Sequence, residues 1–137
     1  MTIQFTAYGD PKGQPRPRAF SRGGMTRVYD PGTAEGWKGS IAIVAREHKP
    51  PTPIEGPVIV MLLFNFARPK SHSTTKGLRP NAPVYHTAKP DADNLAKAVL
   101  DCLTQLGFWK DDSQVAVLNI RKYYGQAGCD IHIQPIE

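Results

Sequence analysis

The stretch KPDADNLAKAVLDCLTQLGFWKDDSQV, residues 89–115, holds five of the twelve acidic residues of a basic chain. Its first half predicts an amphipathic helix, because apolar residues recur at helical spacing and form one stripe: Leu95, Val99, Leu103 and Leu106. Asp91 or Asp93 can cap the start of this helix. Gly107 stands where a left-handed residue commonly ends one. This helix is the best-defined element of the sequence.

The residues before this helix predict two strands and another helix. Residues 2–8 alternate in polarity as a strand does, and residues 33–47 have apolar residues at helical spacing. Residues 57–66, PVIVMLLFNF, are apolar on both faces, which favours a central place in a sheet. Between the first strand and the first helix, the Gly/Pro/Arg-rich residues 9–31 are expected to be irregular.

The remaining residues complete an α+β pattern. A long loop is expected over residues 67–90, and loops of that length tend to be functional or disordered. Residues 113–124 and 129–136 predict two strands joined by a turn at residues 125–128, as in a hairpin. We therefore predict a single small domain over residues 1–137, with a mixed four-stranded sheet and two helices packed against it in the order β-α-β-α-β-β.

Positive charge is concentrated in two stretches without acidic residues. The formal net charge is +5. The first stretch lies between Asp10 and Asp30 and contains Lys12, Arg16, Arg18, Arg22 and Arg27. The second spans residues 56–90 and contains Arg68, Lys70, Lys76, Arg79 and Lys89. Basic runs are often only solvated surface, but two of them beside an acidic cluster favour a polyanionic ligand, since Lys and Arg neutralise phosphates.

Several classes of protein are disfavoured by what the sequence lacks. The first ten residues have no basic region followed by an apolar one, and the longest apolar run, residues 58–64, is too short to span a bilayer. We expect an unexported protein of the cytoplasm with no membrane contact. Cys102 and Cys129 are isolated, without the spacing of a zinc site or a disulfide framework.

The paired aspartates at the helix start admit two interpretations. An aspartate there is most often a cap, but capping accounts for one of Asp91 and Asp93, not both. Two neighbouring carboxylates repel each other, so a pair kept together usually has a cation between them. A calcium loop is excluded, because Leu95 and Ala96 stand where that loop needs an oxygen ligand and a glycine. On its own, D-x-D is a weak signal.

The order of the whole segment is more specific. D-x-D-N-L-x-K, a short amphipathic helix and then G-F-W-x-D-D-x-Q-V resembles the RusA family of Holliday junction resolvases, phage and prophage endonucleases that cut four-way DNA junctions. The resemblance is strongest over residues 90–115, and the opening YGDPKGQPRPRAF is similar in a less specific way. It implies a Mg²⁺-dependent endonuclease that acts on branched DNA as a homodimer, by paired symmetric cuts.

The resemblance also implies site residues. It places the catalytic, metal-binding aspartates at Asp91, Asp93 and Asp112 and the catalytic lysine at Lys97, and it makes the two basic stretches DNA-binding surfaces. Carboxylates are hard ligands suited to Mg²⁺, and a lysine ammonium can bind a phosphate. The residues themselves do not choose between Asp111 and Asp112, whose side chains point to opposite sides of an extended chain. The family pattern favours Asp112.

Three questions stay open at this point. Lys97 could instead form a surface ion pair with Asp93 or Asp101. Asp112 can approach Asp93 in the same chain only if the chain doubles straight back after the helix; otherwise a dimer would complete the site. Finally, the chain could be a non-catalytic nucleic-acid-binding protein, or a metal-dependent nuclease without junction preference.

Phe108 and Trp109 could wedge into a junction, but we expect them in the core.

Overall fold

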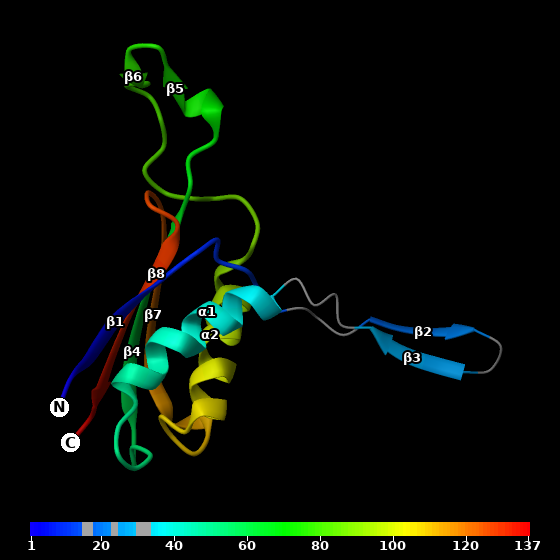
Figure 1. The fold of residues 1–137 in the computed structure, drawn as a ribbon, viewed down its shortest axis with the longest axis vertical. Coiled ribbons are helices and arrows are strands. Elements are labelled where there is room, and N and C mark those ends of the chain that lie inside the picture. Colours follow the sequence, from blue (N-terminus) through cyan, green and yellow to red (C-terminus); the bar gives the residue numbers. More distant parts are fainter. Residues whose placement is uncertain (15–17, 23–24, 30–33) are drawn as a thin grey trace.

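The computed structural model describes residues 1–14, 18–22, 25–29 and 34–137, and only the backbone of residues 18–22 and 25–29. A four-stranded sheet has two helices packed on one face (Figure 1). Its elements are β1 (Ile3–Tyr8), α1 (Glu35–His48), β4 (Val58–Phe66), α2 (Ala92–Leu106), β7 (Val115–Tyr124) and β8 (Gly128–Pro135). The predicted fold class and element order are confirmed.

The order of strands in the sheet is β1-β8-β4-β7. The central position expected for β4 is confirmed, because β4 pairs in parallel with β7 on one side and antiparallel with β8 on the other. The predicted hairpin of β7 and β8 is therefore wrong. The turn between them passes over the end of β4, where the N–H of Gly125 donates to the carbonyl of Phe66 at 2.9 Å. A strand with two apolar faces is most stable when both of its edges are paired, and β4 takes the place between β7 and β8.

At the start of β8 the chain packs closely against β1. A Cβ atom on Gly128 would lie 2.6 Å from the backbone oxygen of Ala7, so only glycine fits there without a shift of backbone. Gly128 pairs with Tyr8 in the antiparallel register of the two strands. The turn predicted at residues 125–128 therefore ends where β8 begins to pair with β1.

The core lies between the sheet and the two helices. Alternate residues of β4 are buried, as are Trp37, Ile41 and Ala45 of α1. Of the predicted stripe of α2, Leu95, Val99 and Leu103 are buried and Leu106 is partly buried. Phe108 and Trp109, directly after α2, are 0% and 1% exposed, as predicted. The indole N–H of Trp109 donates to Thr104 Oγ1 at 2.8 Å, which satisfies its one polar atom. Neither aromatic side chain is available as a wedge.

The basic stretch near the N-terminus is not irregular throughout. Strands β2 (Arg18–Arg22) and β3 (Met25–Tyr29) pair antiparallel, with Arg22 opposite Met25. The prediction of an irregular segment over 9–31 is wrong for these residues. A signal was present in the sequence, because two glycines stand between the strands and Gly-Gly is a preferred two-residue hairpin connection.

The predicted long loop contains short regular pieces. The 3₁₀ turn η1 (Lys70–His72) precedes two-residue strands β5 (Ser73–Thr74) and β6 (Gly77–Leu78), which pair with each other. This segment projects beyond the end of the sheet (Figure 1). Its return is joined to β7 by an isolated bridge between Tyr85 and Tyr123. In the described part of the chain, no helix is long and apolar enough to cross a membrane.

Candidate functional site

The N-terminus of α2 presents two exposed carboxylates. Asp91 occupies the N-cap position with extended backbone (φ −70°, ψ 150°), yet its side chain makes no capping hydrogen bond. Its backbone carbonyl accepts the first helical bond, from the N–H of Leu95 at 3.1 Å. Asp93 lies in the first turn, and its Oδ1 accepts from the N–H of Asn94 at 2.9 Å. Asp91 therefore occupies the predicted N-cap position, but its carboxylate does not cap the helix.

A second pair of aspartates lies on the turn after α2. The left-handed Gly107 (φ 88°) ends the helix as predicted, and the 3₁₀ turn η2 (Asp112–Gln114) follows. Asp111 is the N-cap of η2, and its Oδ1 accepts from the N–H of Ser113 at 2.9 Å. That backbone bond holds the pKa of Asp111 below its ordinary value. Asp111 therefore has a structural role.

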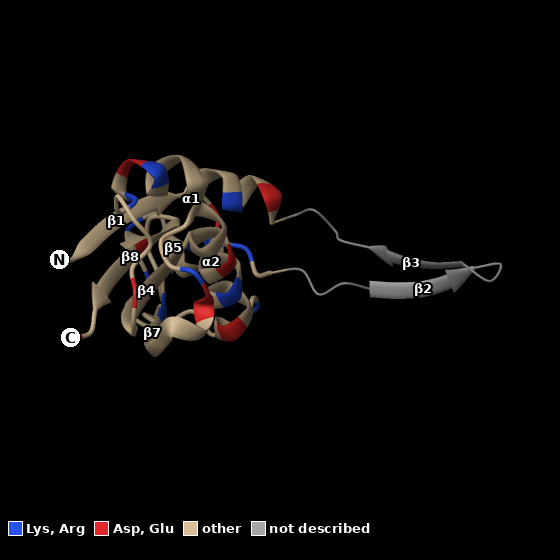
Figure 2. Ribbon diagram, turned by 90° about the horizontal axis from the view of Figure 1, so that it is seen from below, with Lys and Arg blue, Asp and Glu red and all other residues tan. Residues whose placement is uncertain are grey.

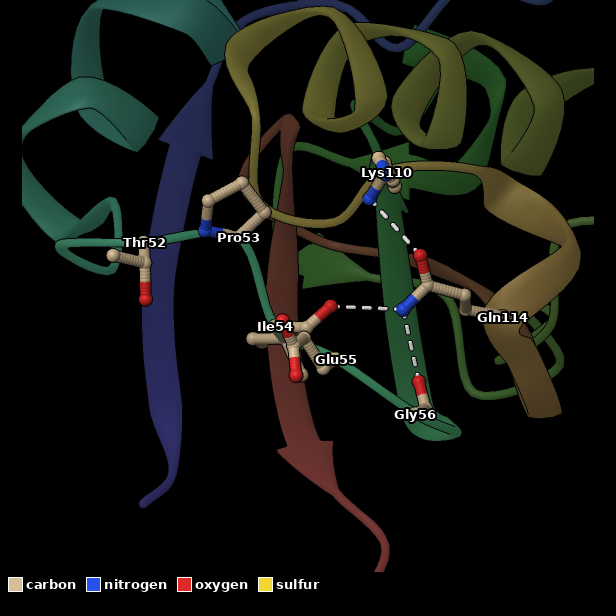
Figure 3. Close-up of a pocket in the computed structure, with 7 residues that line it drawn as sticks. All are labelled: Thr52, Pro53, Ile54, Glu55, Gly56, Lys110 and Gln114. Atoms are coloured by element: carbon tan, nitrogen blue, oxygen red, sulfur yellow. Dashed lines mark hydrogen bonds between the residues drawn. The ribbon is translucent and has the colours of Figure 1, made fainter.

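Gln114 fixes this turn to the rest of the domain. Its side-chain oxygen accepts from the N–H groups of Lys110 and Asp111, at 3.0 and 3.1 Å. Its amide N–H₂ donates to the carbonyls of Ile54 and Gly56, at 2.8 and 2.9 Å. Figure 3 shows Gln114 between Lys110 and the 54–56 segment, at the wall of a hollow that none of the predicted site residues lines. The hollow is not the candidate site, but the clamp beside it determines where Asp112 lies.

Asp112 meets α2 in the same chain. Its Oδ2 lies 3.4 Å from the Nζ of Lys97, and Oδ1 of Asp101 lies 3.1 Å from the same ammonium. Hydrogen bonding and charge interaction with Asp101, and then with Asp112, raise the pKa of Lys97. The chain does double straight back, as the approach of Asp112 to α2 requires. Lys97 pairs with Asp101 and Asp112 rather than with Asp93.

The predicted metal ligands are not assembled into a ready cluster. Within the described residues, no three His, Cys, Asp or Glu side chains are placed as a group that could hold a metal ion. The donor chemistry nevertheless fits Mg²⁺, which takes one or two carboxylates and keeps several waters. Asp91 is exposed and its side chain makes no capping hydrogen bond, and the side chain of Asp112 is 34% exposed. Exposed carboxylate oxygens are therefore present at the start of α2 and on the turn that returns to Lys97.

A comparison with known families decides the class of protein. The family model described as endodeoxyribonuclease RusA matches residues 8–134. The chain belongs to the RusA family. It is thus a hydrolase acting on DNA, and the resemblance drawn from residues 90–115 extends over nearly the whole chain. A similar protein, the uncharacterized protein YqaN of Bacillus subtilis (strain 168), is 40% identical over 127 residues, which cover 90% of this chain and 89% of the relative.

In this RusA-family chain, the first basic stretch begins beside the acidic end of α2. The N–H of Gln14 donates to the carbonyl of Asn94 at 2.9 Å. A Cβ atom on Gly13 would lie 3.0 Å from the Cβ of Asn94, so the two segments are in close contact. Lys12 is exposed next to this contact. Arg16 lies outside the described residues, and of Arg18, Arg22 and Arg27 only the backbone is described.

In the second stretch, two of the basic side chains are engaged within the protein. Arg68 donates to the carbonyl of Pro83 at 2.8 Å, and its guanidinium lies 5.2 Å from the centre of the Tyr124 ring. Arg79 donates through Nε to the carbonyl of Ser71 at 2.9 Å. These bonds hold the projecting segment together. The remaining basic residues of this stretch are exposed: Lys70, Lys76 and Lys89.

Sequence reasoning missed one cation near the site, Lys122 of β7. Its Nζ donates to the carbonyl of Ala88 at 2.8 Å, three residues before Asp91. The alternation of side chains along the predicted strand could have indicated it, because Lys122 is two residues from Ile120 and shares its half-buried face. Around α2, acidic and basic segments alternate in the ribbon (Figure 2).

Proposed function

We propose that this chain is a Mg²⁺-dependent endonuclease that resolves four-way DNA junctions by paired symmetric cuts. In this proposal the chain is a single domain that acts as a homodimer in the cytoplasm. One observation supports it above the others: the turn after α2 returns Asp112 to Lys97, one helical turn from Asp93. The turn that carries Asp112 and the helix that carries Asp93 and Lys97 thus lie side by side, in a chain of a DNA-cleaving family.

Each of the four residues has a role in the proposal. Asp91, Asp93 and Asp112 hold the metal, and Lys97 binds the scissile phosphate or stabilises the leaving oxygen. A bound Mg²⁺ supplies positive charge for the developing phosphate charge and lowers the pKa of its water. Asp101 lies 3.1 Å from the ammonium of Lys97, so it could keep that ammonium in place if Asp112 binds the metal.

The homodimer follows from the geometry of the substrate. A four-way junction offers two symmetry-related strands, and a two-fold dimer provides two equal active sites for them. The ten basic residues named from the sequence would form the DNA-binding surface. Because Lys and Arg release counterions when they contact phosphates, we expect junction affinity to fall steeply with salt. An affinity that does not change with salt would contradict this part of the proposal.

The test uses a labelled synthetic four-way junction and the matching linear duplex, each with Mg²⁺ or with chelator. The wild type is compared with Asp93→Asn and with Asp111→Asn, which makes the same chemical change at an aspartate that caps η2. We expect paired symmetric cuts in the junction alone, lost with chelator and with Asp93→Asn but kept with Asp111→Asn. Sedimentation of the protein with and without junction measures whether two copies bind.

The other outcomes separate the rival functions. Cuts in both substrates would mean a metal-dependent nuclease without junction preference. Binding without cutting under any divalent metal would mean a non-catalytic DNA-binding protein with structural aspartates. Activity of Asp93→Asn equal to that of the wild type would remove Asp93 from the site, and a monomer on the junction would remove the dimer.

A further inference from the structure

Lys122 lies on the side of the sheet that faces the helices, near the end of β7. In the parallel register it stands opposite Phe64 of β4, which is fully buried. Strand β7 is at the edge of the sheet, so this position is half-buried rather than enclosed. A lysine here can reach beyond the edge of the sheet, toward the segment that leads into α2.

The ammonium of Lys122 is bonded to the segment that leads to Asp91. Its Nζ donates to the carbonyl of Ala88 at 2.8 Å, and the backbone carbonyl of Lys122 accepts from the N–H of His86 at 3.0 Å. Partial burial lowers the pKa of Lys122, while the charge of Asp91 acts in the opposite direction. Among the described residues, Lys122 makes no salt bridge, so its ammonium is bonded to a backbone carbonyl and not to a carboxylate.

His86, whose N–H bonds the backbone of Lys122, is buried against aromatic rings. The ring of His86 stacks on that of Phe66, with ring centres 3.8 Å apart, and its edge approaches Tyr124. Burial is the first cause that lowers the pKa of His86, followed by the charge of Lys122. The ammonium of Lys122 has two N–H groups beyond the one that donates to the carbonyl of Ala88, and these can bind a further acceptor.

Lys97 and Lys122 differ in their partners. Lys97 lies 3.4 Å from the carboxylate of Asp112, whereas Lys122 reaches across from β7 and donates to the backbone carbonyl of Ala88. A half-buried lysine without an acidic partner at bonding distance gains little stability for the fold. Such a cation is well suited to an anion that arrives from solvent, and the anion of the proposed substrate is the DNA phosphate.

We propose that Lys122 is a second phosphate-binding lysine of the cleavage site, which contacts the DNA backbone on the Asp91 side. This inference rests on the proposed function, because it takes DNA as the ligand. The competing explanation is that Lys122 only tethers the carbonyl of Ala88 and so positions the segment before α2.

The two explanations differ in the salt dependence of binding. Junction affinity is measured with chelator present, over a series of salt concentrations, for the wild type, Lys122→Met, Lys122→Arg and Lys49→Met. Lys49 is an exposed lysine at the C-cap of α1, before β4 begins, and its change to Met removes the same charge and keeps a similar stem. Thermal unfolding of each variant shows whether it is folded.

We expect Lys122→Met to lower the steepness of the salt dependence by about 0.9 in log–log slope, as for one lost phosphate contact. Between 50 and 200 mM salt, its affinity should then fall roughly three- to fourfold less than that of the wild type. Lys122→Arg should restore the slope, and Lys49→Met should match the wild type. Lys122→Met with an unchanged slope would reduce Lys122 to a tether and overturn the inference.

A measurement on the wild type avoids any dependence on folding of the variants. An amine-reactive reagent is applied with and without bound junction, and the modified lysines are identified by mass spectrometry. We expect the junction to protect Lys122 and leave Lys49 unprotected; equal labelling of Lys122 in both states would contradict the contact. If the wild type neither binds nor cuts the junction, the proposed function fails, whereas binding with an unchanged slope makes only this inference fail.

Discussion

The two turns that present paired aspartates use the first aspartate of each pair differently. Asp91 and Asp111 both occupy an N-cap position in extended backbone. The carboxylate of Asp111 accepts the N–H of Ser113 within a complete capping box, whereas the carboxylate of Asp91 makes no such bond. A carboxylate that serves as a cap is occupied, and one that does not can bind a cation. The carboxylate of Asp111 thus has a structural role, whereas that of Asp91 is not used as a cap, as the proposed metal-binding role requires.

The largest effect on cutting is expected from Asp91→Asn, which is measured together with Asp111→Asn. Asp91→Asn removes charge without removing a capping hydrogen bond, so we expect cutting to fall by on the order of 10³-fold with no change in thermal unfolding. Asp111→Asn should leave cutting within a few-fold of the wild type. Rates are measured on a labelled four-way junction with Mg²⁺, and equal losses in both variants would contradict the distinction.

Lys97→Met should have the next largest effect. Lys97 lies between Asp101 and Asp112 at 3.1 and 3.4 Å, and methionine keeps a similar stem while it removes the charge. We expect cutting of bound junction to fall by about 10²-fold, as when one electrostatic partner of a transition state is lost. Lys110→Met, at an exposed residue before η2, is the matched control. If both variants cut equally fast, Lys97 is only a partner in surface ion pairs.

Gln114→Ala tests whether the clamp on η2 supports the site. The change removes two hydrogen bonds accepted and two donated by one side chain, so we expect a loss of about 1–2 kcal/mol in the free energy of unfolding by urea. Because Asp112 lies in the clamped turn, cutting should also fall, by roughly tenfold. Gln105→Ala, at an exposed residue of α2, should change neither quantity.

The smallest effect is expected at Asp111 itself. Its pKa is lowered in the folded protein, first by the backbone N–H of Ser113, so its charge stabilises the fold at neutral pH. This stabilisation is complete above the unfolded pKa of about 4 and is lost as the pH falls through the folded pKa. Urea unfolding of wild type and Asp111→Asn should differ slightly at pH 7, and the difference should shrink below about pH 4. A difference that is constant with pH would contradict the role of charge at this cap.

The fold was predictable where local information determines it. The helix predicted around the stripe from Leu95 to Leu106 ends at Gly107 as expected, because a repeating apolar spacing and a left-handed glycine act within a few residues. Pairing of strands acts over long separations, and there prediction failed: β7 and β8 are adjacent in sequence but lie on either side of β4. Strands that are adjacent in sequence are usually expected to pair as a hairpin, but the two apolar faces of β4 favour a neighbouring strand on each of its edges.

The candidate site divides in the same way. The pairing of Lys97 with Asp101 follows from helical spacing alone, whereas the contact of Lys97 with Asp112 joins residues fifteen apart. The sequence could not separate Asp111 from Asp112, and the capping box of η2 separates them by fixing one carboxylate on Ser113. Lys122 was missed because its partner, Ala88, is thirty-four residues away.

By itself, the sequence determined the α+β class, the helix around which the acidic residues gather and the resemblance to the RusA family, which the family match confirms. These depend on spacing within one element and on a motif of some twenty-five consecutive residues. Only the tertiary structure decided that β4 separates β7 from β8, that Asp112 returns to Lys97, and that Lys122 is bonded to Ala88 in the segment before Asp91. Those placements depend on how the chain turns after α2 and on which strand edges pair, because side chains far apart in sequence meet only once the core has packed.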